Sequence, residues 1–193
     1  MRIVGGAYKG RKIGVSREFD SRPTTDFARE ALFNILANIV DFEMISVLDL
    51  FSGTGSISFE FASRGCQDID LVDNNGRSVH FIGRVANDFG MKGIHPVRMD
   101  VFNFIRICRK QYHVVFADPP FEMKNLAEVP GFVMQHNILL PEGIFVLEHP
   151  GSIGFHQVPG FMRERKYGNV HFSFFAPVHA REDNLTGETH NQY

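Results

Sequence analysis

Cysteine is scarce in this sequence, and the residue types that bind metals are scattered rather than clustered. Two cysteines are present among 193 residues, and neither belongs to a C-x-x-C pair. The nine histidines form neither an H-x-x-x-H nor an HExxH pattern. Because protein zinc sites are built from ligands at such spacings, we expect Cys66 and Cys108 to be reduced, inert thiols and we expect no metal ion.

Long apolar runs are missing too. No run reaches the roughly 20 residues that a helix needs to cross a bilayer, and the opening "MRIVGGAYKGRK" lacks an apolar core of signal-peptide length. We therefore expect a cytoplasmic protein without a membrane partner. With 193 residues, of which 44% are apolar, the chain is long enough for one well-buried core and short for two.

The chain has no general excess of basic residues, since its formal net charge is −2. Positive charge is instead concentrated in residues 1–29, where seven Lys and Arg face three Asp and Glu, a surplus of +4 that leaves −6 on the rest. A basic arm on an acidic body indicates local contact with phosphate groups. A solvated N-terminal extension is the alternative that charge alone leaves open.

The N-terminal part is predicted to form a small hairpin followed by a helix. The segment "RIVGGAYKGRKIGV" places short apolar positions in alternation around glycines, as hairpins do. The next segment, "RPTTDFAREALFNILANIV", has an apolar stripe at four-residue spacing, which predicts an amphipathic helix capped by Thr24 or Thr25. The stripe consists of Phe27, Ala31, Ile35 and Ile39, with Leu32 and Leu36 beside it.

From residue 46 onward, strand patterns and helix patterns alternate. Strands are predicted at 46–51, 68–73, 94–99, 112–117 and 143–149, with two more within 161–177 around a turn. Helices are predicted at 56–64, 76–89 and 101–110, and a broken helix at 123–137. This alternation predicts an α/β fold whose mostly parallel sheet is covered by helices on both faces, with an antiparallel addition at one edge.

In such folds ligands bind at the carboxyl ends of the strands, and the first strand end here carries glycines. In "VLDLFSGTGS", Gly53 and Gly55 permit a tight turn and close approach of a ligand to the backbone. A dinucleotide fingerprint would require a third glycine where Ser58 stands, and Asp49 would repel a pyrophosphate. The pattern therefore favours a nucleotide-like cofactor without phosphates, against the alternative of a structural turn.

The next two strand ends are also acidic. Asp73 is placed to accept hydrogen bonds from both hydroxyls of a ribose. Asp100 is placed to accept from the exocyclic amine of an adenine while Val101 or Phe102 covers the ring. Taken singly, an aspartate at such a position is more often a helix N-cap. Three acidic strand ends beside a glycine turn make a cofactor site the better interpretation.

The fourth strand end reads Asp118-Pro119-Pro120-Phe121. The two prolines fix the backbone and make the loop stiff. The Asp118 carboxylate and a proline carbonyl can accept the two N–H groups of an aromatic amine, and Phe121 offers a flat face on which a base can stack. A tight turn capped by aspartate is the alternative.

Together these segments resemble a class I S-adenosylmethionine-dependent methyltransferase with a Rossmann-like sheet, and most closely the RsmD-type enzymes. The opening "MRIVGGAYKGRKI", the segment "RPTTDFAREALFNIL", "DPPF", Glu148-His149 and the "KYG…SFF" strand pair carry the resemblance over residues 1–177. It implies methylation of the N2 amine of a guanine in small-subunit (16S) ribosomal RNA.

The resemblance also implies roles for individual residues. S-adenosylmethionine would be bound by Asp49, Phe51, Gly53, Gly55, Asp73, Asn74, Asp100, Val101 and Phe102. The target amine and base would be held by Asp118, Pro119, Pro120 and Phe121. RNA would be contacted by Lys9, Arg11, Lys12, Arg22 and Arg29.

We accordingly expect three parts: an RNA-contacting extension over 1–40, a catalytic domain over 41–179 and a disordered tail over 180–193. The substrate is expected to be ribosomal RNA, within a small-subunit particle or assembly intermediate, and the enzyme a monomer. Two alternatives remain. A DNA adenine-N6 methyltransferase uses a similar loop but normally needs a separate recognition domain. A catalytically inactive, cofactor-binding assembly factor is disfavoured by the intact Asp118-Pro119-Pro120-Phe121.

Overall fold

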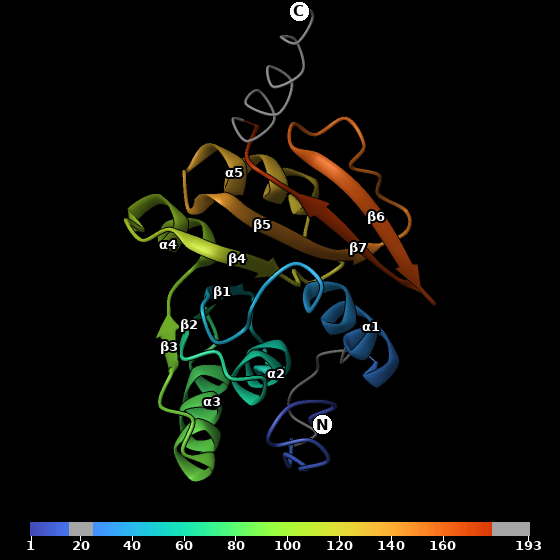
Figure 1. Ribbon diagram of the computed structural model, residues 1–193. Coiled ribbons are helices and arrows are strands. Elements are labelled where there is room, and N and C mark those ends of the chain that lie inside the picture. The colour runs from blue at the N-terminus through green and yellow to red at the C-terminus, as the bar shows by residue number, and fades with distance from the viewer. Residues whose placement is uncertain (16–24, 179–193) are drawn as a thin grey trace, which may run out of the picture.

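A seven-stranded sheet forms the centre of the protein, with helices on both faces (Figure 1). The computed structural model describes residues 1–15 and 25–178. The strands are β1 (Ser46–Leu50), β2 (Asp68–Asp73), β3 (Ile94–Arg98), β4 (Tyr112–Ala117), β5 (Leu139–Pro150), β6 (Phe161–Tyr167) and β7 (Val170–Phe175). The helices are α1 (Asp26–Leu36), α2 (Ser56–Ser63), α3 (Gly76–Phe89), α4 (Val101–Ile107) and α5 (Val129–Gln135), the last preceded by a 3-10 turn, η1 (Leu126–Glu128).

The order of the strands is β3-β2-β1-β4-β5-β7-β6. The first five strands of this order pair in parallel, whereas β7 runs antiparallel to both β5 and β6. The strand order therefore reverses between β1 and β4, the point at which open α/β sheets bind their ligands. The predicted Rossmann-like α/β class, including the antiparallel addition, is confirmed. No helix in the described ranges is long and apolar enough to cross a membrane.

The largest departure from the predicted boundaries is in β5, which begins four residues early. Pro141, Glu142 and Gly143 suggest a turn in the sequence, yet Leu139 still pairs with Tyr112. The register then shifts, and regular pairing resumes at Val114 and Ile144. Strand pairing across this irregularity overrides the local turn signal. Conversely, α4 ends at Ile107, three residues before its predicted end.

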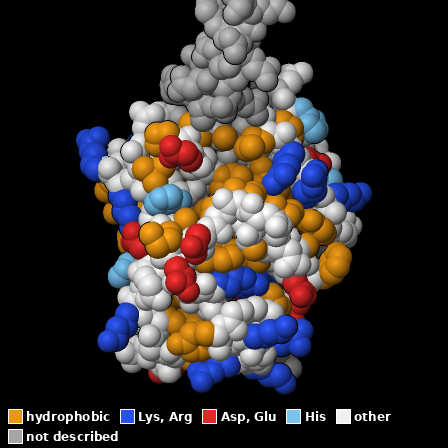
Figure 2. Space-filling model, in the orientation of Figure 1, with side chains coloured by type: hydrophobic (Ala, Val, Ile, Leu, Met, Phe, Trp, Pro, Cys, Tyr) orange, Lys and Arg blue, Asp and Glu red, His pale blue; other side chains and the backbone are white. Residues whose placement is uncertain are grey.

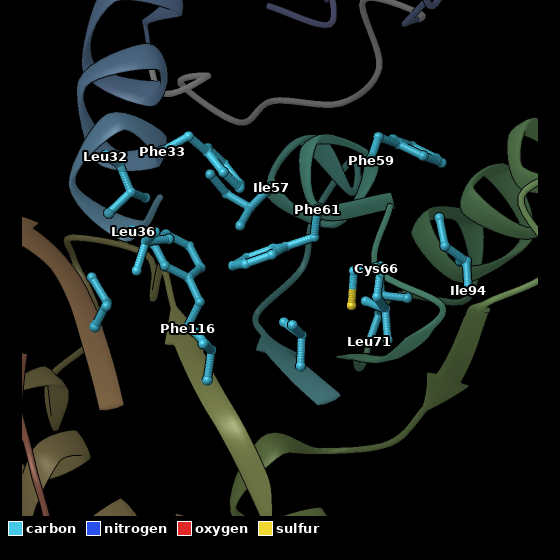
Figure 3. Packing of buried hydrophobic residues seen from close by; sticks show 14 of the residues in the cluster. Leu32, Phe33, Leu36, Ile57, Phe59, Phe61, Cys66, Leu71, Ile94 and Phe116 are labelled. Atoms are coloured by element: carbon cyan, nitrogen blue, oxygen red, sulfur yellow. The ribbon is translucent and has the colours of Figure 1, made fainter. Parts of the chain in front are cut away.

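Each face of the sheet has its own apolar core. On one face, residues of α1, α2 and α3 pack against alternate residues of the strands, including Val47, Phe116 and Val146. Figure 3 shows this packing, in which Phe33 of α1 meets Phe61 of α2 edge to face at 4.8 Å between ring centroids. On the other face, residues of α4, η1 and α5 cover the intervening strand positions.

Helix α1 is capped as predicted, but its buried stripe is shifted by one residue. Thr25 accepts the amide of Ala28 at 3.2 Å and so caps the helix. The stripe that faces the core contains Ala28, Leu32, Phe33 and Leu36. The two ends of the predicted stripe are exposed, Phe27 by 69% and Ile39 by 45%, whereas Ala31 and Ile35 between them are half-buried. Two apolar series lie side by side on α1, and only the tertiary contacts decide which is buried.

The N-terminal residues form a closed loop rather than a regular hairpin. A single antiparallel bridge joins Arg2 and Lys12, and Ile3 exchanges backbone hydrogen bonds with Arg11 and Gly10 at 3.0 and 2.8 Å. Gly6 turns with φ 72°, and a Cβ there would lie 1.9 Å from the carbonyl oxygen of Ser63. Since Ile3 belongs to the same core as α1 and the sheet, this loop is part of the main fold.

Arg29, predicted to bind RNA, lies inside the protein. It is 1% exposed, donates to the Arg2 carbonyl at 2.7 Å and to Asp26 at 2.5 Å, and lies 3.4 Å from Glu60. Glu60 also accepts the amide of Val4 at 2.5 Å. A buried guanidinium held by these groups cannot reach phosphate, so the prediction for Arg29 is wrong. Arg29 instead joins α1 and the N-terminal loop to α2.

Candidate active site

The glycine turn after β1 presents its backbone toward open space. Phe51, Gly53 and Gly55 all have left-handed φ values, of 60°, 52° and 75°. A Cβ on Gly55 would lie 3.0 Å from Ile82, so glycine lets this turn pack against α3. A Cβ on Gly53 would meet nothing closer than 3.9 Å, which leaves that side of the turn free for a ligand. A bulky residue such as Phe51 adopts this conformation only at a cost, which is typical of functional turns.

Asp73, at the end of β2, ties the glycine turn to the neighbouring strand. One carboxylate oxygen accepts the amide of Gly53 and the other accepts the amide of Asn75, each at 2.8 Å. Asn75 in turn caps α3. Asn74 is exposed between them. The structure therefore brings Asp73 and the glycine turn together, as the sequence predicts.

Asp49 lies inside β1, directly beneath the turn. It is 2% exposed and accepts the hydroxyl of Ser58 at 2.6 Å. Burial raises the pKa of Asp49 to about 7, opposed by the Ser58 hydrogen bond and reinforced by the charge of Asp73. Ser58 stands where the dinucleotide pattern would have its third glycine. The serine at this position therefore provides the hydrogen bond to Asp49. Sequence reasoning did not assign Ser58 to the site.

The end of β3 and the start of α4 add an aromatic wall. Asp100 is exposed and caps α4 by accepting the amide of Asn103 at 3.0 Å. The side chain of Val101 is buried, whereas Phe102 is half-buried and meets the ring of Phe51 edge to face at 6.4 Å. Asp100 thus serves as the N-cap of α4. A contact with adenine, as predicted from the sequence, would require the same carboxylate to accept a second hydrogen bond.

The Asp118-Pro119-Pro120-Phe121 loop begins beside the glycine turn, because β4 is the neighbour of β1. The amide of Asp118 donates to the carbonyl of Leu50 at 3.3 Å. The carbonyl of Pro120 already accepts the amide of Met123 at 2.9 Å. The carbonyl of Pro119 is therefore the better candidate for the second acceptor of an amine. Phe121 is half-buried, and its ring packs at the edge of the second core.

The ionisation of Asp118 is influenced by two other carboxylates at this end of the strands. The pKa of Asp118 is raised well above its ordinary value, chiefly by burial, then by the charge of Glu148 and then by that of Asp49. Glu148 lies near the end of β5 and is 3% exposed. In the sequence, Glu148-His149 at a strand end contributed to the family resemblance, but no role was predicted for Glu148. Raised carboxyl pKa values at strand ends are typical of a functional site.

The three basic residues of the N-terminal loop that were predicted to contact RNA are exposed. They are Lys9, Arg11 and Lys12. The guanidinium of Arg11 lies 5.2 Å from the centroid of the Tyr8 ring, which itself stacks on Phe89 of α3. Figure 2 shows Lys and Arg side chains along the lower part of the face, where Figure 1 draws the N-terminal loop and α3, and others at its upper left and upper right. The predictions for Arg22 and for a disordered tail over 180–193 lie outside the described residues.

Comparison with known proteins places these features in a family. The sequence model of a family described as "Conserved hypothetical protein 95" matches residues 1–176. The chain is similar to Ribosomal RNA small subunit methyltransferase D of Escherichia coli (strain K12), with 31% identity over 180 residues, covering 91% of this chain and 89% of that protein.

Solved structures show the same architecture. A putative methyltransferase yhhF from Escherichia coli superposes with a TM-score of 0.78 at 28% identity, covering 92% of this chain and 97% of that one. A hypothetical protein of Thermus thermophilus superposes with a TM-score of 0.80 at 26% identity, covering 91% and 99%. The likeness therefore extends over more than nine-tenths of this chain.

Proposed function

The chain belongs to the Conserved hypothetical protein 95 family and is an RsmD-type methyltransferase, and from this premise we propose that it methylates the N2 amine of a guanine in small-subunit ribosomal RNA, using S-adenosylmethionine. The observation that carries the proposal is the meeting of the glycine turn with Asp118-Pro119-Pro120-Phe121 where the strand order reverses. The first supplies a cofactor site, and the second supplies acceptors for an aromatic amine.

The residues around the glycine turn fit this cofactor. Within the described ranges the hydroxyl of Ser52 is buried and has no hydrogen-bond partner, and so is available to a polar ligand. Asp49 provides a carboxylate for an amine, and Asp73 provides one for ribose hydroxyls. When bound, S-adenosylmethionine supplies an electrophilic methyl group on a sulfonium. Phe51 and Phe102 would cover the adenine, since their rings meet beside the turn.

Asp118 and Pro119 would hold the target amine. The lone pair of an aromatic amine is delocalised into its ring, which makes it a poor nucleophile. Hydrogen bonds from its two N–H groups to the Asp118 carboxylate and the Pro119 carbonyl would favour pyramidal geometry and stabilise the positive charge that develops on nitrogen. The raised pKa of Asp118 suits it to take up the released proton. Phe121 would stack on a base that has left its helix.

The pH dependence of cofactor binding should follow Asp49. With a pKa of about 7, this carboxyl is mostly neutral below pH 6 and mostly ionised above pH 8. An ionised Asp49 attracts the amine of the cofactor, so affinity measured by calorimetry should fall about tenfold per pH unit below 7 and level off above it. In Asp49→Asn this dependence should disappear. An equally steep dependence in the variant would assign the effect to another group.

The N-terminal loop should contribute electrostatic affinity for RNA. Replacing Lys9 and Lys12 with glutamine removes two exposed charges. If both contact phosphate, the slope of log affinity against log salt should fall by about 1.5–2, with unfolding unchanged. Filter binding of small-subunit RNA over a salt series measures this slope. The control is the double variant Lys92→Gln/Lys124→Gln, which replaces two other exposed lysines. An equal fall of the slope in both double variants would show that only the total charge of the protein matters.

Labelled S-adenosylmethionine tests the proposed function against its alternatives. The protein is incubated in turn with naked small-subunit ribosomal RNA, assembled small subunits and duplex DNA. Label in RNA, mapped to the N2 amine of one guanine, is the expected result, with stronger labelling of the particle. Label confined to adenine in DNA would favour an adenine-N6 methyltransferase. Cofactor binding without labelling of any substrate would favour an inactive assembly factor.

A further inference from the structure

Glu148 shares one face of the sheet with the two aspartates of the site. Side chains alternate between the faces of a strand. Val146 belongs to the core beneath α1 and α2, as do Phe116 of β4 and Val47 of β1. Two residues further along each strand, the same face carries Glu148, Asp118 and Asp49. Three carboxylates from three neighbouring strands therefore meet on one face.

The pairing register makes Glu148 the direct neighbour of Asp118. Ala117 pairs with Leu147, so the next residues, Asp118 and Glu148, continue side by side. Adjacent strands lie about 4.8 Å apart. Asp49 pairs with Phe116, which is two residues before Asp118 on β4, so Asp49 lies further inside the sheet than Asp118. Glu148 is thus beside the proposed amine acceptor, at the level of the substrate, while Asp49 is beneath it. The charge of Glu148 acts on Asp118, as their proximity requires.

We propose that Glu148 determines specificity for guanine by accepting the N1–H of the target base while Asp118 holds its N2 amine. This role rests on the proposed function. The Watson–Crick edge of guanine presents N1–H and the N2 amine as adjacent donors, which two adjacent carboxylate acceptors match. The corresponding edge of adenine or cytosine presents one amine beside a ring nitrogen that bears a lone pair. A buried carboxylate facing that lone pair would be repelled and would gain no donor from the base.

The burial of Glu148 favours this role over general attraction of RNA. At 3% exposure, its carboxylate is removed from bulk solvent on a strand buried on both faces. A carboxylate there repels phosphate and is shielded from bulk water, so a hydrogen bond that it accepts from the N1–H of a base is stronger than one made in solvent. Opposite Glu148 on β7 is Phe172, whose ring lies 6.0 Å from Tyr167. Phe172 is completely buried and belongs to the core beneath α1 and α2, so it places an apolar ring beside Glu148 on that side.

The test uses a base that keeps the amine and lacks the N1–H. In 2-aminopurine the amine is retained, but N1 has a lone pair in place of hydrogen. Small subunits are reconstituted with guanine or 2-aminopurine at the mapped position, and transfer is measured for wild type, Glu148→Gln and Glu142→Gln. Wild type should prefer guanine by about 100-fold or more. Glutamine can accept from guanine N1–H or donate to 2-aminopurine N1, so Glu148→Gln should narrow the preference to within about tenfold.

Controls separate this result from misfolding and from failure of the proposed function. Glu142 lies on the same strand but is exposed, so Glu142→Gln should keep the wild-type preference. 2-Aminopurine also lacks the O6 carbonyl, but that loss is common to all three proteins and cancels in the comparison. Unchanged cofactor affinity of Glu148→Gln shows that it is folded, and Glu148→Asp, which keeps the charge, should keep the preference for guanine.

Two outcomes would overturn the role of Glu148 while the proposed function stands. One is equal use of guanine and 2-aminopurine by the wild-type protein, which needs no variant to measure. The other is a Glu148→Gln protein that binds cofactor normally and prefers guanine as strongly as wild type. Absence of transfer to guanine from any wild-type preparation would instead overturn the proposed function, and the role of Glu148 with it.

Discussion

Replacing Asp118 with asparagine is expected to lower the rate of methyl transfer by about 10²–10³-fold or more, while S-adenosylmethionine still binds with nearly wild-type affinity. Asparagine has the same shape but lacks the charge that stabilises a positive nitrogen. Its amide nitrogen would also oppose an N–H of the substrate. Single-turnover labelling measures the rate, and calorimetry measures the affinity. Loss of both together would make Asp118 a cofactor ligand or a structural residue.

The stability of the same variant provides an internal control. Since the pKa of Asp118 is raised in the folded protein, folding free energy is lost as the pH rises above the ordinary pKa of an aspartate. Asparagine removes this cost, so thermal unfolding of Asp118→Asn at pH 8 should occur at the wild-type temperature or above it. Glu122→Gln alters an exposed carboxylate in the same loop and should leave both rate and unfolding unchanged. A similar loss of rate in that variant would point to the loop as a whole.

Replacing Glu60 with alanine is expected to destabilise the protein by about 3–5 kcal/mol, which corresponds to a fall of roughly 6–20 °C in Tm. Glu60 is completely buried and lies among Arg29, Arg64 and the amide of Val4. Its removal takes from the buried guanidinium of Arg29 one of its two carboxylate neighbours, leaving Asp26, and removes the acceptor of the Val4 amide. Urea and thermal unfolding measure the change.

A second variant distinguishes the effect of the unbalanced charges around Glu60 from a general sensitivity of this region. In Arg29→Met/Glu60→Met both charges are replaced by apolar groups, so most of the lost stability should return. Glu30→Ala changes the exposed neighbour of Arg29 on α1 and should have an effect within about 0.5 kcal/mol. If Glu60→Ala were as mild as Glu30→Ala, the buried network would not be what holds the N-terminal loop.

Local sequence was sufficient to predict the alternation of strands and helices and the strand ends that form the candidate site. Periods of two and near 3.6 in apolar residues distinguish strands from helices, and glycines and prolines mark where they end. For this reason 68–73, 76–89 and 112–117 were predicted with the bounds that the structure has. The glycine turn and the Asp118-Pro119-Pro120-Phe121 loop are short continuous segments, so their chemistry can be recognised from the sequence.

What the sequence could not decide depends on contacts between distant residues. On α1 two apolar series compete, and the buried one is chosen by packing on the sheet and by the meeting of Arg29 with Glu60, 31 positions away. Likewise, Ser58 serves Asp49 only because α2 folds back over β1.

The neighbourhood of Glu148 and Asp118 shows the same limit at the proposed active site. The sequence by itself placed a carboxylate at the end of each of these strands. The sheet register, set by pairing across β4 and β5, brings the two side chains together on one face. A shift of one residue in that register would send Glu148 to the opposite face. Local sequence is enough to predict where a strand ends and which side chain it carries there. Which other side chains lie beside it is decided only when the strands pair.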